Sequence, residues 1–157
     1  MADTSASQPC LDAAYRYLSY RPRSEGEVRQ RLFQHGFVSE EVERAIAKLK
    51  EQKLIDDFAF ARFWKDSRLS FRPKSKRLIA RELRNKRVAA DIVDEITKDI
   101  DDELNAYTIG CTRMRFLADL DYPRFRQRLS GYLSYRGFSH QVIRDTASRL
   151  WRERKTK

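Results

Sequence analysis

A run of basic side chains lies between residues 68 and 87, where nine residues are Lys or Arg and only Glu82 is acidic. The next stretch, residues 91–103, reverses the sign, with seven acids and one base. A helix face solvated by mixed charges does not separate the two signs so sharply. Cations at this density break no bonds by themselves, but they bind phosphate groups or the acidic side chains of another protein. The pattern therefore favours a binding surface.

Three of these arginines share one helical stripe. Arg77, Arg81 and Arg84 follow at i, i+4 and i+7, while the apolar residues Ile79 and Leu83 lie on the opposite side of the same helix. Further cations precede the stripe, and others occur near the end of the chain. The residues expected to bind a partner are Arg68, Arg72, Lys74, Lys76, Arg77, Arg81, Arg84, Arg124, Arg126, Arg128 and Arg136.

Residues for catalysis are sparse. His35 and His140 each flank a Gly-Phe turn, and neither belongs to an HExxH pattern. Cys10 and Cys111 form no CxxC pair, which favours small buried or surface residues over redox centres. The five glycines are scattered singly, so no phosphate-binding loop is indicated. We expect no catalytic residue, no metal and no cofactor.

Two acidic clusters, Asp56-Asp57 and residues 99–103, have an alternative interpretation as ligands of a divalent metal in a nuclease. Each cluster falls where one helical segment gives way to the next. Carboxylates at such positions suit helix N-caps and the positive end of the helix dipole. We therefore favour a capping role over metal catalysis.

The composition predicts a helical protein with a bias toward anionic partners. Apolar residues make up 41% of the 157 residues, with only 5 Gly and 4 Pro, which suits long helices. The 33 Lys and Arg exceed the 23 Asp and Glu, for a net charge of +10, although a simple role in solubility explains the same excess. No apolar run is long enough to span a bilayer, and nothing directs export. We expect a cytoplasmic monomer with reduced thiols.

The sequence repeats itself. YLSYRPRS at residues 17–24 is echoed by RLSFRPKS at 68–75, and the same offset matches Val28 with Ile79 and Leu32 with Leu83. A further step of 50 residues, from Ile79 to Leu129, places a third unit after the second. Short helix pairs cannot bury their apolar faces alone, so such units must stack and share a core.

Each unit predicts three helices. In the first, residues 11–20 form a helix that ends before Pro22, Ser24 and Glu27 form a capping box, and Gly36 supplies the left-handed residue that ends the second helix. Arg87 stands where the other units have glycine. Because a non-glycine residue in the left-handed region costs about 1 kcal/mol, we expect the middle helix to end without a full Schellman motif.

The predicted fold is thus all-α, with three tandem three-helix repeats that form an elongated, curved helical array. The expected segments are a flexible tail at 1–9, repeats at 10–55, 56–100 and 101–153, and a basic tail at 154–157.

The stretch LIDDFAFARFWKDSRLSFRPKS, residues 54–75, resembles the RecX family of bacterial regulators of the RecA recombinase. The resemblance extends to RPRSEGEVRQRL at 21–32, the Gly-Phe turn at 36–37 and YRGF at 135–138. This chain departs from the family pattern at Arg87 and over residues 105–120, where motif content is weak.

The resemblance implies three tandem three-helix units and a role without an enzymatic active site. It also implies binding in the groove of RecA filaments on single-stranded DNA and inhibition of strand exchange, ATP hydrolysis and coprotease action. The residues alone leave two rivals: a helix-turn-helix-like protein that binds single- or double-stranded DNA directly, and a helical scaffold for another acidic protein.

Overall fold

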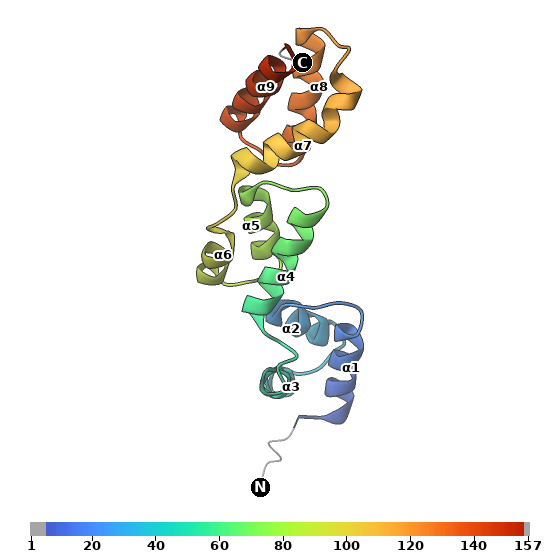
Figure 1. Cartoon of the computed structure of the whole chain (residues 1–157). Coiled ribbons are helices and arrows are strands. Elements are labelled where there is room, and N and C mark those ends of the chain that lie inside the picture. Colours follow the sequence, from blue (N-terminus) through green and yellow to red (C-terminus); the bar gives the residue numbers. More distant parts are fainter. Residues whose placement is uncertain (1–5, 156–157) are drawn as a thin grey trace. The chain divides into compact units, whose positions relative to one another are not determined.

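The computed structural model describes residues 6–155, which form helices and contain no strand (Figure 1). The predicted all-α class is confirmed. The chain divides into two compact units: the first comprises the chain up to residue 65 with residues 82–96, and the second comprises residues 66–81 with the chain from residue 97 on. This division passes within α4 (Asp57–Ser70) and α5 (Lys76–Asn85). None of the described helices is long and apolar enough to cross a membrane.

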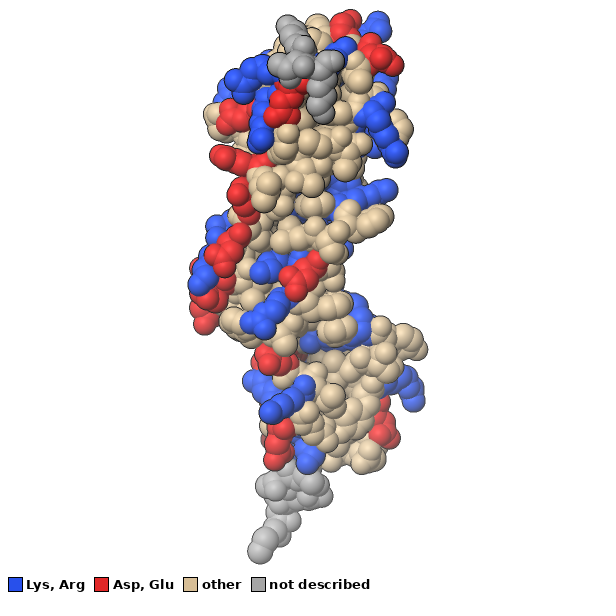
Figure 2. All heavy atoms as spheres, viewed as in Figure 1, with Lys and Arg blue, Asp and Glu red and all other residues tan. Residues whose placement is uncertain are grey.

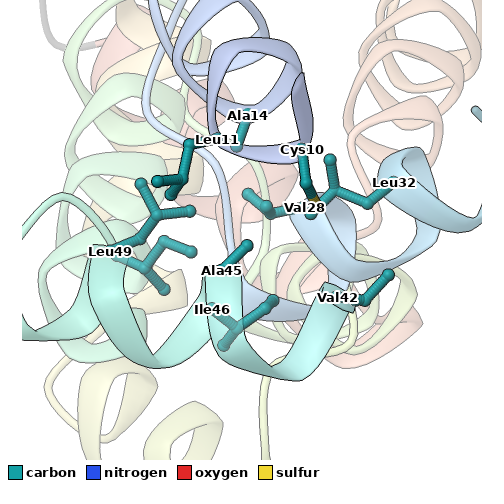
Figure 3. Packing of buried hydrophobic residues seen from close by; sticks show 10 residues of the cluster. Cys10, Leu11, Ala14, Val28, Leu32, Val42, Ala45, Ile46 and Leu49 are labelled. Carbon is teal, nitrogen blue, oxygen red and sulfur yellow. The ribbon is translucent and has the colours of Figure 1, made fainter. Parts of the chain in front are cut away.

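The first three helices are α1 (Gln8–Leu18), α2 (Glu25–Gln34) and α3 (Ser39–Glu51). They enclose a core to which each helix contributes side chains (Figure 3). The buried residues of these helices are Cys10, Leu11, Ala14, Val28, Leu32, Val42, Ala45, Ile46 and Leu49. Their spacing of three and four residues is what directs one face of each helix inward.

The first helix begins earlier than the predicted residue 11. Ser7 is its N-cap and accepts a hydrogen bond at Oγ from the backbone N of Cys10 (3.3 Å), and Pro9 occupies the first turn, where proline is tolerated. The helix ends at Leu18, two residues before the predicted end. Part of the predicted N-terminal tail is therefore helical.

Serine caps start the second helix of two repeats, and the predicted capping box at Ser24 is one of them. Ser24 Oγ accepts from Glu27 N (3.1 Å) while Glu27 Oε1 accepts from Ser24 N (3.2 Å), which completes the capping box. At the equivalent position of the next repeat, Ser75 Oγ accepts from Leu78 N (3.1 Å) at the start of α5. The middle group ends with α6 (Ala90–Thr97).

The last three helices are α7 (Asp102–Leu117), α8 (Tyr122–Tyr135) and α9 (His140–Lys155). Helix α7 forms despite its weak motif content, because Ala106, Ile109 and Leu117 are buried against the core. Its Gly110 allows close packing, since a Cβ there would lie 2.4 Å from Leu150 Cδ1 of α9.

The prediction for the middle turn is wrong. Arg87 adopts a left-handed φ of 64°. Its backbone N donates to Arg84 O (2.9 Å), and Val88 N donates to Leu83 O (3.1 Å), which is the full Schellman pattern. The same pair of bonds closes the glycine turns at Gly36 (φ 90°) and Gly137 (φ 91°). Lys53 (φ 60°) ends α3 with the same pair of bonds, so a left-handed residue other than glycine closes two of the turns in the described residues.

The turn at Arg87 forms the first of two junctions built on one plan. In the first unit, Ser24 Oγ donates to Lys86 O (2.5 Å), and a Cβ on Gly26 would lie 2.4 Å from Arg87 Cβ. In the second unit, Ser75 N donates to Arg136 O (3.0 Å). A helix start is thus packed against a turn in each unit.

Glycine lies on opposite sides of the two junctions. Gly26 makes room for Arg87 at the first, whereas at the second the turn residue is Gly137, where a Cβ would lie 2.5 Å from Ser75 Oγ and 2.9 Å from Leu78 Cβ. One glycine at each junction is enough to let the turn approach the helix.

The predicted tails, residues 1–9 and 154–157, lie partly outside the described residues, and α9 continues to Lys155. The predicted repeat boundaries at 55/56 and 100/101 fall in the links after α3 and α6. They stay predictions, since the compact units divide the chain elsewhere.

Candidate binding surface

The basic segment covers the end of α4, the link that follows it and all of α5. The link is held by Arg136, the residue that caps the end of α8. Its Nη1 donates to Arg72 O (3.0 Å), and its carbonyl oxygen accepts from Ser75 N (3.0 Å). Pro73 within the link prevents α4 from continuing through it. The cations of the link therefore project from a fixed backbone.

The predicted stripe is present on α5. Arg77, Arg81 and Arg84 are exposed, while Ile79 and Leu83 of the same helix are fully buried. Arg72 and Lys76 are also exposed, and Arg68 and Lys74 are half-buried. The helical spacing separates the cationic side of α5 from its apolar side, as the sequence indicated.

The predicted cations of the third repeat do not act as one group. Arg124 and Arg128 are exposed on one flank of α8, and Arg126 is exposed on the other, because residues two apart in a helix point nearly opposite ways. Arg136 is buried, with 7% of its surface exposed. We assign Arg136 a structural role, since its guanidinium holds the link and is not free to meet a partner.

The two acidic clusters cap helices. Asp56 accepts from a backbone N in the first turn of α4 (3.1 Å), and Asp101 does the same for α7 (3.1 Å). Asp57 and Asp102 each reach back to the first residue of an earlier helix, accepting at 2.7 Å and 2.9 Å. Burial raises the pKa of both reaching carboxyls. Among the described residues, no three potential metal ligands come together.

The surface reproduces the charge separation of the sequence only in part. Figure 2 shows acidic side chains gathered over α6, and in the same view Lys and Arg side chains lie over each of the three helix groups. Positive charge is therefore not confined to α5. What distinguishes this helix is the regular spacing of its exposed arginines.

The histidines and cysteines occupy unremarkable positions. His35 caps the end of α2 and His140 begins α9, and both are exposed, as expected for histidines at helix ends. Cys10 is fully buried, and its burial raises the pKa of the thiol, which keeps it protonated. Cys111 is exposed.

Exposed aromatic residues are the feature that sequence reasoning missed. Tyr20 is 77% exposed and Phe71 is 80% exposed, and they occupy the same register before the repeated Arg-Pro. An aromatic residue repeated at this position could have indicated an exposed aromatic pair from the sequence. Phe116, 57% exposed on α7, lay in the region of weak motif content and had no such signal.

Two family models match the chain: the first three-helix domain of RecX at residues 10–49 and the second three-helix domain of RecX at residues 56–96. A regulatory protein RecX from Prosthecochloris aestuarii is 33% identical over 146 residues, covering 93% of this chain and 96% of the relative. Another, from Streptomyces coelicolor, is 32% identical over 127 residues, covering 79% of this chain and 68% of the relative.

Solved structures have the same fold. The crystal structure of RecX from Lactobacillus salivarius aligns with a TM-score of 0.76 at 22% identity, covering 90% of this chain and 94% of that one. A second crystal structure, of a regulatory protein RecX, aligns with a TM-score of 0.69 at 26% identity and covers 87% and 70%. The predicted tandem three-helix architecture is thereby confirmed.

Proposed function

Because the chain belongs to the RecX family of regulatory proteins, we propose that it regulates the RecA recombinase by binding in the groove of RecA filaments on single-stranded DNA. In this proposal it acts in the cytoplasm and inhibits strand exchange, ATP hydrolysis and coprotease action. It does so by occupying the filament, without a catalytic step or cofactor of its own.

The observation that carries the proposal is the arginine stripe of α5. Arg77, Arg81 and Arg84 are all exposed on one helix, opposite buried side chains. A filament repeats its surface with every subunit, so a row of cations on a rigid helix suits regularly spaced anionic groups. Several modest contacts of this kind add through avidity, which makes binding depend on filament assembly.

The first test measures RecA ATP hydrolysis on single-stranded DNA as this protein is added. Inhibition at amounts well below one protein per RecA is the expected result, because one molecule lodged in a groove affects several subunits. An ATPase rate that stays constant up to a molar excess would reject the proposed inhibition.

A second test locates the surface. Arg77, Arg81 and Arg84 are replaced together by Glu, and the matched control replaces three other exposed arginines, Arg16, Arg62 and Arg144, with the same change in net charge. We expect the α5 variant to lose filament binding and inhibition, while the control keeps both. Equal losses in the two variants would show that net charge, and not the stripe, governs binding. Equal helicity by circular dichroism confirms that both variants fold.

Direct DNA binding by a helix-turn-helix is the alternative function. In such modules the helix that enters the groove presents its first turn to the DNA. Here α3 carries Glu40 and Glu41 in its first turn, and α6 carries Asp91 in its own. These carboxylates repel phosphate. If duplex DNA is nonetheless the main partner, the slope of log affinity against log salt concentration will be about −0.9 per contacted phosphate. Binding to the duplex will then occur without RecA.

A further inference from the structure

A second basic surface lies on α7 and α8, outside the stripe of α5. Its residues alternate between arginine and aromatic side chains in space. Two guanidinium groups approach the ring of Tyr132, with Arg113 Cζ 4.2 Å and Arg136 Cζ 4.7 Å from the ring centroid. Phe116 continues the series, with Arg113 Cζ at 5.3 Å and Arg115 Cζ at 4.5 Å from its centroid. We name this arginine–aromatic ladder by its members, Arg136, Tyr132, Arg113, Phe116 and Arg115.

The inner end of the ladder is rigid and the outer end is open to solvent. Arg136 is buried and donates from Nη2 to the Tyr132 hydroxyl (3.1 Å). At the other end, Phe116 is 57% exposed and Arg115 is exposed. The outer end therefore presents an aromatic ring flanked by two cations to the solvent, where a further planar group can stack.

The charge of the outer arginines is not neutralised. Within residues 6–155, no carboxylate lies within ion-pairing distance of Arg113 or Arg115. A comparable contact in the same unit differs: Arg149 lies 3.6 Å from the Tyr107 centroid but also pairs with Glu153 (3.1 Å). The ladder therefore keeps a positive potential that the Arg149–Tyr107 pair, with its carboxylate partner, has lost.

We propose that the exposed end of the arginine–aromatic ladder binds single-stranded nucleic acid, with unpaired bases stacking on Phe116 while Arg113 and Arg115 contact phosphates; the buried Arg136 only holds the inner end in place. Aromatic faces beside cations are the features that single-strand binding requires. Carboxylates of an acidic protein satisfy the guanidinium groups but make no use of the exposed ring. In a duplex, the bases are paired and stacked and do not reach it. This inference rests on the geometry of the ladder alone and does not depend on the proposed action on RecA.

The test measures binding of the full chain to a fluorescently labelled oligothymidylate by anisotropy, in the absence of RecA. Phe116→Ala is expected to weaken binding about tenfold, the size of one lost base stack. Phe33→Ala, an exposed phenylalanine of α2, is the matched control and should bind as the unaltered chain does. Phe116→Trp should keep the affinity, and its added fluorescence should be quenched by the bound strand.

Charge is tested in the same assay. Arg113→Gln with Arg115→Gln should reduce the slope of log affinity against log salt by about 1.4, since each phosphate contact on single strands contributes about 0.7. Arg149→Gln, the carboxylate-paired arginine, should leave the slope unchanged. A duplex of matched length should bind more weakly than the single strand and should not respond to Phe116→Ala.

Four results would overturn the inference: no binding of the oligothymidylate at low salt, unchanged affinity in both ladder variants, equal losses in the Phe33 and Arg149 controls, or an equal loss on duplex DNA. Ladder variants that bind DNA normally but no longer inhibit RecA would assign the surface to a protein contact instead. RecA is absent from the binding assay, so the two proposals are tested separately. Failure of single-strand binding leaves RecA regulation intact, and failure of RecA regulation leaves single-strand binding intact.

Discussion

The junction between Gly26 and Arg87 permits a sharp test of the packing. An alanine Cβ at residue 26 would lie 2.4 Å from Arg87 Cβ, and both atoms are attached directly to backbone, so neither can swing aside. Overpacking of a buried site costs about 1–3 kcal/mol, and alanine in a helix regains about 0.5–1 kcal/mol. From the midpoints of these two ranges, Gly26→Ala should therefore lower the free energy of unfolding by about 1 kcal/mol.

Gly131 of α8 provides the matched control, since a Cβ there meets no atom within 4 Å. Gly131→Ala should raise stability by about 0.5–1 kcal/mol, because only the helix-propensity gain remains. Urea unfolding followed by circular dichroism measures both changes, and each kcal/mol corresponds to a shift in melting temperature of about 2–4 °C.

A double variant isolates the contact. Arg87→Gly removes the opposing Cβ and suits the left-handed φ of 64°, so Gly26→Ala should be far less destabilising in that background. If Gly26→Ala is as stable as the unaltered chain, or if Arg87→Gly does not relieve its effect, the proposed steric reason for glycine at residue 26 is wrong.

Three further predictions concern the core, a cap and the pH. Leu32→Ala should lower the free energy of unfolding by about 2–5 kcal/mol in urea melts, because the side chain is fully buried. Ser24→Ala should cost about 1–2 kcal/mol by the same measurement, since it removes an N-cap and the donor to Lys86 O. Burial raises the pKa of Asp102 in the folded state, so its contribution to stability is present at low pH and is lost as the pH rises through that pKa. The stability of the unaltered chain relative to Asp102→Asn should thus increase as unfolding is measured at progressively lower pH.

Local patterns predicted most of the helices correctly. The capping box at Ser24 and the apolar spacing of α2 and α5 act within a single turn or helix, so they can be read without knowledge of the fold. The start of α1 was misplaced because the cap at Ser7 was overlooked, although the pattern of serine followed by proline was there to read.

The candidate surface was predicted only in part. The α5 arginines follow from helical spacing, and the structure exposes all three. Arg136 looked like another surface cation, but its guanidinium is buried against the carbonyl of Arg72, a residue of a different helical group. Charge alone does not distinguish an arginine that meets a partner from one that satisfies a buried carbonyl.

By itself, the sequence determined that the chain forms three groups of helices, where most of them start, and which of their faces are buried, because these properties depend on residues within a few positions of one another. Only the tertiary structure decided that the Arg87 turn packs against Gly26, and that Tyr132 and Phe116, on different helices, share Arg113 in one ladder. Both depend on residues that lie far apart in the chain or on different helices and meet only when the helices pack.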